Sequence, residues 1–252
     1  MSDHLALTSA VDHPPHVGLL SARGILNGAT YRTLRDGIVK AALDAPRAVV
    51  VDVSALTVDP PSAWSVFTAA RWLVSVWPDV PIMLVCDHQR GRDAIVHNGV
   101  ARYVPVYADA DGATAAAAMR GSPGGRRHAR TSLQRNEEGR TEARQFTAET
   151  LTAWHCQELV PVACTVAWVL VDNVLAHTES TPVITVEAMA GDVTIAVADG
   201  STSPAVRHEY STGGTDIVSG LSIVSALTRR WGALPTGAGK TVWAVIGPEN
   251  RL

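Results

Sequence analysis

Val169-Leu170-Val171-Asp172-Asn173-Val174-Leu175-Ala176-His177 is the stretch that most clearly predicts the fold of the C-terminal half. It extends an apolar run that begins at residue 160, and this length and composition indicate a long, buried helix. Asn173 and His177 are four residues apart, so a helix places both on one face. A carboxamide and an imidazole on such a helix are candidate ligand-binding groups.

The rest of the C-terminal half alternates predicted helices with predicted strands. The elements expected there are an amphipathic helix over 141–155, the apolar helix over 160–175, strands over 183–187 and 193–197, a helix over 220–231 and a strand over 242–246. Residues 248–252 are expected to form a short C-terminal tail. This alternation predicts a sheet covered by helices, so the expected fold class is α/β.

The N-terminal half shows the same alternation in shorter elements. Strands are expected over 17–20, 48–53, 82–85 and 103–107, and helices over 31–43, 62–77, 93–97 and 111–119. The run 48–53 is rich in valine, which is typical of a strand covered on both faces. Residues 1–15 are expected to form an N-terminal tail, so a domain is predicted over 16–120.

A change of composition separates the two halves. Residues 121–125 are rich in glycine, serine and proline, and residues 126–130 are rich in arginine. The stretch 121–140 therefore predicts a mobile linker between the domain at 16–120 and a second domain at 141–247. The alternative is that the basic cluster contacts nucleic acid, but a net charge of −3 gives no support for a nucleic-acid partner.

Composition places the chain among globular proteins. With 252 residues, 18% charged and 46% hydrophobic, it can form one large domain or two ordinary ones. Its three cysteines form no Cys-x-x-Cys pair, and His155, Cys156 and Cys164 match no zinc-binding spacing. The N-terminus shows no signal-peptide pattern, and the longest apolar run, 160–171, falls short of a membrane span. We expect a cytoplasmic protein without membrane contact.

Three segments of the N-terminal half carry a family resemblance: Gly24-Ile25-Leu26, residues 49–54, and Val58-Asp59-Pro60-Pro61-Ser62. With the order of elements, they resemble a STAS domain, the module of the anti-anti-sigma factors, which are anti-sigma factor antagonists. The resemblance implies a STAS-like α/β fold over 16–120 and contact with a regulator of a sigma factor. It also implies a loop in which a partner kinase phosphorylates a serine.

That loop lacks its acceptor in this chain. Pro60 and Pro61 occupy the positions where the family has a hydroxyl residue, and proline cannot accept a phosphoryl group. Ser62 follows directly and is expected to cap the next helix, with phospho-acceptor as the alternative role. A phosphate there would bring roughly two negative charges to a helix N-terminus. We expect that this input has been lost.

The motifs from Asn173 onwards resemble, in their order and spacing, the histidine-kinase-like ATPase domain of the anti-sigma factor serine kinases. The resemblance implies a Bergerat-type α/β sandwich over 141–247 that binds ATP or ADP with magnesium. It places Asn173 on the magnesium ion, for which a carboxamide oxygen is a suitable ligand. It places Asp199 on the adenine amino group and Gly220 beside the phosphates. A buried, backbone-bonded Asn173 and a turn aspartate before Gly200 are the structural alternatives.

Three more residues belong to the implied nucleotide site. His177 completes the family's Asn-x-x-x-His pattern, although a histidine at a helix C-terminus also suits the helix dipole. Thr241 is implied to lie near the adenine, with Lys240 beside it. A P-loop over Gly237-Ala238-Gly239-Lys240-Thr241 is rejected, because Leu234 stands where that motif needs glycine and a strand is expected to follow.

The same helix lacks the residue that active kinases of this family use as a base. Their glutamate lies four residues before the asparagine, and this chain has Val169 there, which cannot take a proton. Asp172 points about 100° away from Asn173 around the helix, and Glu158 lies in the preceding loop. The glycine-rich phosphate motif is reduced to Val218-Ser219-Gly220-Leu221. No catalytic residue is therefore assigned.

These departures favour a regulator over an enzyme. The first hypothesis is a partner-switching protein that joins an anti-anti-sigma-like domain to an anti-sigma-like domain and acts by protein–protein contact, gated by nucleotide. Its expected partners are a sigma factor or an anti-sigma or anti-anti-sigma protein, with a homodimer left open. The alternative is an active protein serine kinase that phosphorylates a separate STAS partner. A third hypothesis is a scaffold whose pocket binds no nucleotide.

Overall fold

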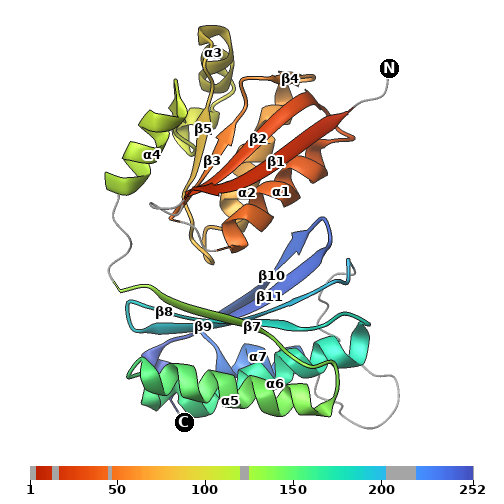
Figure 1. Ribbon diagram of the computed structural model, residues 1–252, viewed down its shortest axis with the longest axis vertical. Helices are drawn as coiled ribbons and strands as arrows, with labels where there is room; N and C mark the ends of the chain where they lie inside the picture. Colours follow the sequence, from red (N-terminus) through yellow and green to blue (C-terminus); the bar gives the residue numbers. More distant parts are fainter. Residues whose placement is uncertain (1–3, 13–16, 45–46, 120–124, 203–219, 252) are drawn as a thin grey trace. The chain divides into compact units, whose positions relative to one another are not determined.

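The computed structural model describes residues 4–12, 17–44, 47–119, 125–202 and 220–251. The chain folds as two compact units, Met1–Ser122 (unit 1) and Pro123–Leu252 (unit 2). Both units combine helices with a central sheet (Figure 1), so the predicted α/β fold class is confirmed at this level.

Unit 1 is built on a six-stranded sheet with the order β1-β2-β3-β5-β6, in which β4 pairs with β2. The strands are β1 (Leu5–Asp12), β2 (Val17–Leu26), β3 (Ala48–Asp52), β4 (Leu56–Val58), β5 (Ile82–Val85) and β6 (Val106–Tyr107). The helices are α1 (Tyr31–Leu43), η1 (Pro61–Trp64), α2 (Ser65–Leu73), α3 (Gln89–His97), η2 (Val100–Arg102) and α4 (Ala110–Met119). β1 runs antiparallel to β2, and the other pairs are parallel.

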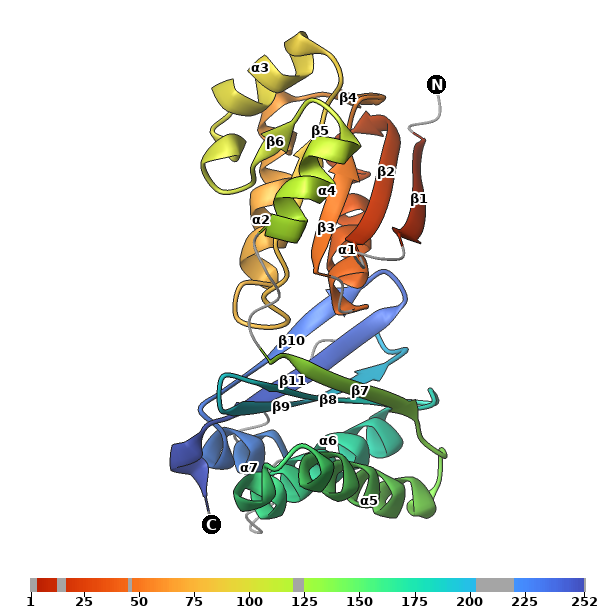
Figure 2. The same cartoon turned by 60° about the vertical axis from the view of Figure 1, so that its left-hand side comes forward.

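Helices cover both faces of this sheet, because α1 and α2 lie on one side and α4 on the other (Figure 2). Successive residues of a strand point to opposite faces. Val50 of β3 faces α4, where it packs with Val85, Ala113 and Ala117. The valine run of β3 is therefore buried on both sides, as its composition predicts.

Three details of unit 1 differ from the prediction. Residues 5–12 form strand β1 and not a tail, because antiparallel pairing with β2 gives the backbone of this segment hydrogen-bonding partners. The helix expected over 62–77 is a 3₁₀ turn followed by a shorter α2 that ends at Leu73. Ser62 therefore does not cap it: Trp64 is the residue before α2, and Pro60 precedes the 3₁₀ turn.

Unit 2 is a two-layer sandwich with an antiparallel five-stranded sheet in the order β10-β11-β9-β8-β7. The strands are β7 (Arg127–Ser132), β8 (Val183–Met189), β9 (Asp192–Asp199), β10 (Arg230–Thr236) and β11 (Gly239–Ile246). The helices are α5 (Glu137–Ala153), η3 (Gln157–Leu159), α6 (Val160–His177), α7 (Gly220–Leu227) and η4 (Pro248–Asn250). α5, α6 and α7 lie on the same face of the sheet (Figure 1).

α6 is the core helix of unit 2. Val162, Val166 and Leu170 are almost fully buried against Ile195 and Val197 of β9 and other apolar residues of the sheet. Among the described residues, the stretch Gln157–His177 is the one helical segment long and apolar enough to cross a membrane, and 56% of its apolar window is buried inside the protein. Its hydrophobicity is accounted for by packing between α5, α7 and the sheet.

Two strands of unit 2 lie where the sequence predicts other structure. Arg127–Ser132, expected within the mobile linker, is the edge strand β7, paired with β8. Trp231, expected at the end of a helix, lies in β10, because α7 ends at Leu227 and the chain returns beside β11. Neither edge strand shows a regular alternation of apolar and polar residues, so both strands are difficult to predict.

Candidate functional site

Asn173 and Gly220 meet where α6 packs against the start of α7. A Cβ atom built on Gly220 would lie 2.8 Å from Asn173 Oδ1 and 3.2 Å from Asn173 Nδ2. The same atom would lie 3.0 Å from Val169 Cγ1. The first residue of α7 therefore approaches the carboxamide as closely as its backbone permits. The structure thus brings together Asn173, Val169 and Gly220, three positions singled out from the sequence.

No acidic side chain takes the place of the missing base on this part of α6. Val169 is 4% exposed and presents only alkyl groups. Asp172 is turned toward α5, where its Oδ1 lies 2.6 Å from Arg140 Nη2. Glu158 pairs with Arg251 at 2.6 Å. Both acidic alternatives from the sequence are therefore engaged elsewhere.

Asp199 ends β9 on the helix-covered face of the sheet, because it shares the alternation of the buried residues Ile195 and Val197. Its carboxylate is 3% exposed, and Oδ1 accepts hydrogen bonds from Lys240 Nζ at 3.2 Å and from the Ser201 amide at 2.7 Å. Lys240 lies directly opposite Asp199 in the pairing of β11 with β9. The predicted adenine acceptor is thus half of a buried ion pair.

Thr241 does not lie beside Asp199. It is opposite Ala198 in the sheet, so its side chain points to the sheet face that α6 does not cover. Lys240 alone of the two predicted residues shares a face with Asp199. The rejected P-loop is also absent from this segment, because Thr236 pairs with Gly239 across a tight hairpin between two antiparallel strands.

Contacts that the sequence did not predict hold the end of β9 in place. Ser180 Oγ accepts a hydrogen bond from the Gly200 amide at 2.9 Å and lies 2.8 Å from Thr178 Oγ1. Gly239 approaches from β11, where a Cβ atom would fall 1.9 Å from the Asp199 carbonyl oxygen. These contacts tie the segment after α6 to the strand that carries Asp199. Only the three-dimensional pairing reveals them, because the residues are distant in sequence.

His177 is the last residue of α6 and is exposed. The helix is extended by a hydrogen bond from the Thr178 amide to the Val174 carbonyl at 2.9 Å, and Arg135 Nη2 donates to the Thr178 carbonyl at 2.9 Å. An imidazole at this end suits the negative pole of the helix dipole. This geometry supports the structural role of His177 that the sequence left open. Val218, Ser219 and the remaining part of the glycine-rich motif lie outside the described residues.

In unit 1, Pro60 directly precedes η1 and Pro61 begins it, and both prolines and Ser62 are exposed. Neither proline offers a hydroxyl. The next serine, Ser65, begins α2 with its Oγ 3.3 Å from the hydroxyl of Tyr31.

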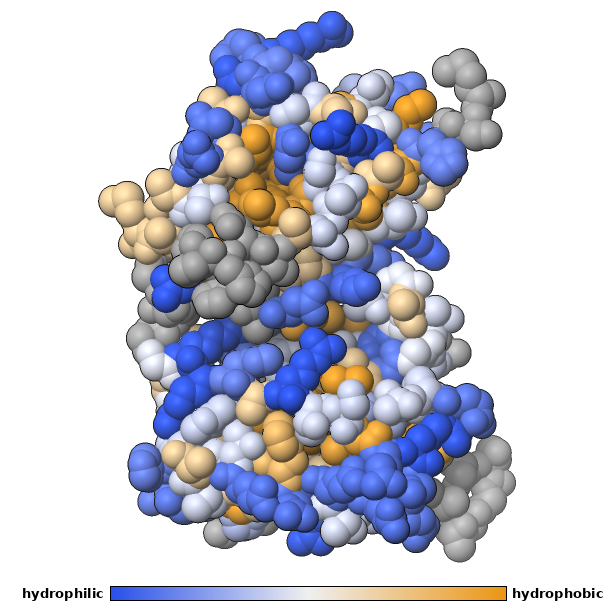
Figure 3. Space-filling view, in the orientation of Figure 1, coloured by the Kyte–Doolittle hydropathy of each residue, from blue (hydrophilic) through white to orange (hydrophobic). Residues whose placement is uncertain are grey.

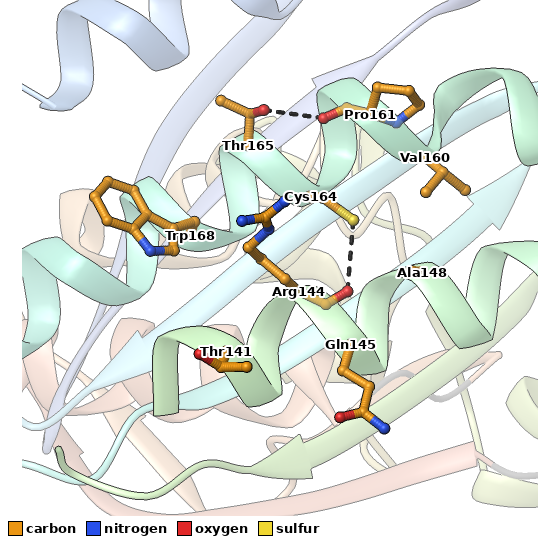
Figure 4. Close-up of a pocket in the computed structure, with 9 residues that line it drawn as sticks. All are labelled: Thr141, Arg144, Gln145, Ala148, Val160, Pro161, Cys164, Thr165 and Trp168. Carbon is orange, nitrogen blue, oxygen red and sulfur yellow. Dashed lines mark hydrogen bonds between the residues drawn. The ribbon is translucent and has the colours of Figure 1, made fainter. Parts of the chain in front are cut away.

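A separate groove of about 650 Å³ runs between α5 and α6. The side chains that line it come from both helices (Figure 4), namely Thr141, Arg144, Gln145, Ala148, Val160, Pro161, Cys164, Thr165 and Trp168. Figure 4 shows the Arg144 side chain reaching into the groove between Trp168 and Cys164. Burial raises the pKa of the Cys164 thiol, which donates to the Arg144 carbonyl at 3.4 Å, so it is not an activated nucleophile. The groove shares no residue with the predicted nucleotide site.

No protein-family model matches the chain, and no curated protein matches it. Among solved structures, the chain is similar to an anti-sigma factor antagonist from Mycobacterium paratuberculosis, with 22% sequence identity, a TM-score of 0.38, and coverage of 45% of this chain and 95% of that one. It is also similar to the anti-sigma factor antagonist SpoIIAA in its unphosphorylated form, with 13% identity, a TM-score of 0.35, and coverage of 44% and 96%. Each similarity covers less than half of this chain.

Proposed function

We propose that this protein is a regulatory partner-switching protein of the anti-sigma and anti-anti-sigma type, which acts in the cytoplasm by protein–protein contact. A sigma factor or an anti-sigma or anti-anti-sigma protein would be its partner, without direct contact to nucleic acid or membrane. Support comes from the STAS-like sequence segments of unit 1 on a sheet with helices on both faces, and from the Asn173 site of unit 2.

The position of Val169 is the observation that carries this proposal over a kinase. Phosphoryl transfer to a hydroxyl needs a group that accepts or orients its proton. Val169 lies against Gly220 and one helical turn before Asn173, where such a group would have to act, and it is buried and apolar. The nearby acid Asp172 is held by Arg140. A site of this kind can bind a ligand while being unable to activate an attacking hydroxyl.

ATP or ADP with magnesium is the ligand that we propose to gate partner binding. Asn173 fits the magnesium ion, because its carboxamide oxygen is a suitable ligand for a hard cation. The N-terminus of α7 fits phosphate oxygens, because Gly220, its first residue, lies directly beside this carboxamide and a helix N-terminus favours anions. Asp199 fits the adenine less well, since an amino group would compete with Lys240 for the same carboxylate. When bound, the nucleotide would supply phosphate charge at α7. Because Lys240 competes for the carboxylate of Asp199, we expect the nucleotide to bind weakly.

In unit 1, the proposed contact with a partner does not depend on phosphorylation of the loop before α2. Pro60 and Pro61 fill this exposed loop and cannot be modified on oxygen. The surface presented there would remain in its unmodified form, without the roughly two charges that a phosphate would add. Unit 1 is accordingly proposed to bind its partner constitutively, leaving regulation to unit 2.

The proposal is tested by binding measurements on the full chain. The purified protein is immobilised and exposed to purified sigma factors, anti-sigma factors and STAS proteins of the source organism, with and without magnesium ADP. We expect at least one of these proteins to bind, with an affinity that nucleotide changes in the wild type and not in Asn173→Ala. Binding to none of them would contradict the proposal.

A further inference from the structure

Among the described residues, five strands pair with a single neighbour, and four of them carry features that hinder pairing with another chain. In unit 1, β4 is only three residues long (Leu56–Val58) and β6 only two (Val106–Tyr107). In unit 2, β7 contains Arg127, His128 and Arg130, and β10 contains Arg230 and Pro235. Short length, charged side chains and proline are the usual protections of an edge strand. The fifth such strand, β1, lacks all of these protections over residues 5–10.

β1 is long and regular. It pairs residue by residue with β2 from Leu5 to Asp12, without a bulge. Its residues 5–10 read Leu-Ala-Leu-Thr-Ser-Ala, with no charge, proline or glycine. Within the described part of unit 1, β1 has β2 as its sole strand partner, and it forms the outer border of the sheet (Figure 2). A backbone edge of this kind is a template for another strand.

The hydrogen bonding shows which amides face outward. The Ile25 amide of β2 donates to the His4 carbonyl at 3.2 Å, so the backbone of His4 faces β2. In an antiparallel pair this orientation alternates along the strand. The backbone groups of Ala6, Thr8 and Ala10 therefore face β2 like those of His4. The N–H and C=O groups of Leu5, Leu7 and Ser9 point away from the sheet.

We propose that the outer edge of β1 is a dimerisation surface, and that its occupant is β1 of a second copy of this chain. Antiparallel pairing about a two-fold axis through Leu7 sets Leu7 opposite Leu7 of the second copy and Leu5 opposite its Ser9. All the outward amides of these three residues then find carbonyl partners. The two six-stranded sheets become one continuous sheet, and each copy uses the same patch, as a two-fold interface requires.

A second copy fits this edge better than a charged partner does. Every antiparallel register of residues 5–10 with themselves sets uncharged side chains opposite one another, so no like charges meet. The strand is also held in place before pairing, because Leu7 packs against α1 at Gly37, where a Cβ atom would lie 2.7 Å from Leu7 Cδ1. Figure 3 shows that the surface of this part of unit 1 has hydrophobic residues between hydrophilic ones. The edge is therefore ordered, uncharged and self-complementary.

Light scattering after size-exclusion chromatography of the full chain, over a dilution series, tests the proposal. We expect the wild type to approach the mass of a dimer as concentration rises. Ser9→Pro removes an outward donor without removing a β1–β2 hydrogen bond, and it should shift the protein to monomer. Ser9→Ala keeps the amide and should remain dimeric. A wild type that is monomeric at every concentration, or a Ser9→Pro variant that is as dimeric as the wild type, overturns the proposal.

Amide hydrogen exchange resolved by residue gives an independent readout that needs no variant. The amides of Ala6 and Thr8 face β2, so their protection should not depend on concentration. The amides of Leu7 and Ser9 should exchange freely in dilute protein and become protected in concentrated protein. Free exchange of Leu7 and Ser9 under both conditions contradicts pairing through β1, including pairing with any other strand in the sample. Dimers in which these amides stay free would show that another surface is used.

Discussion

Gly220 lies against the Asn173 carboxamide so closely that a Cβ atom on Gly220 would be 2.8 Å from Asn173 Oδ1. The start of α7 and Asn173 of α6 are thus in direct contact, although they are distant in sequence. The same Cβ atom would lie 3.0 Å from Val169 Cγ1. The proposed nucleotide site and its missing base are consequently parts of a single packing arrangement.

Gly220→Ala should weaken nucleotide binding while leaving the protein folded. Alanine favours a helix interior by about 1 kcal/mol over glycine, and a smaller gain at the first position of α7 offsets part of the cost of displacing the Asn173 side chain. The displaced carboxamide would no longer face the phosphate region. Titration with a fluorescent ATP analogue and thermal unfolding check both effects. Ser225→Ala, on the same helix, is the control, and unchanged affinity in Gly220→Ala would refute the assignment.

Val169→Glu should place a proton acceptor at the position where the proposed nucleotide site lacks one. The carboxylate enters a site that is 4% exposed, so we expect a loss of stability on the order of 3 kcal/mol, measured by urea unfolding. ATP hydrolysis should appear in this variant and not in Val169→Gln, which matches it in size but cannot take a proton. A Val169→Glu variant that binds ATP without hydrolysing it would argue against position 169 as the missing base.

Lys240→Met should destabilise unit 2 by about 2 to 3 kcal/mol, because it leaves the carboxylate of Asp199 buried without its cation. The double variant Lys240→Met with Asp199→Asn removes the charge and should recover much of this loss. A double-mutant cycle from urea unfolding measures the coupling. If the two single effects simply add, the ion pair contributes nothing to stability.

Asp199→Asn, taken alone, should lower the affinity for ATP, because an amide is a poorer acceptor for the adenine amino group than a carboxylate. Competition with Lys240 implies a second effect: the Lys240→Met variant should bind ATP more tightly than the wild type. Calorimetric titration of the folded variants distinguishes these cases. Equal affinities of the wild type, Asp199→Asn and Lys240→Met for ATP would show that Asp199 does not bind the adenine.

The ion pair between Arg229 and Glu249 should make the stability of the folded protein depend on pH. Hydrogen bonds from Arg229 lower the pKa of Glu249 from 4.5 to about 2, with Nε–Oε1 at 2.5 Å and Nη2–Oε2 at 2.7 Å. Because the pKa of Glu249 is lower in the folded protein than in the unfolded chain, the ion pair contributes fully to stability above pH 4.5. This contribution is lost as the pH falls toward 2. Melting temperatures of wild type and Glu249→Gln should therefore differ at neutral pH and converge in acid. A constant difference would contradict this.

Much of the fold is predictable where apolar residues follow a clear period. The helix Tyr31–Leu43 and the strand Ile82–Val85 have the bounds that the sequence predicts, because their buried residues face a core that dictates the pattern. The strands β1, β7 and β10 lie at sheet borders, where pairing on one edge alone demands no regular alternation of apolar and polar residues, so the sequence gives little signal for them.

The residues of the candidate site can be proposed from the sequence, but their contacts can be predicted only in part. Asn173 and Gly220 can be singled out from motif order, but their contact depends on the packing of α7 on α6. The pairing register decides that Lys240, and not Thr241, faces Asp199, and a shift of one residue would exchange them. Such a register cannot be deduced from one strand alone.

Transfer of the γ-phosphate of ATP tests the central claim most directly. The full chain is incubated with labelled ATP, magnesium and purified STAS proteins of the source organism, under conditions where nucleotide binding has been demonstrated. Our account predicts bound nucleotide and no labelled STAS protein, because Val169 cannot activate the acceptor hydroxyl. Robust labelling that disappears in Asn173→Ala would contradict the account and identify an active serine kinase.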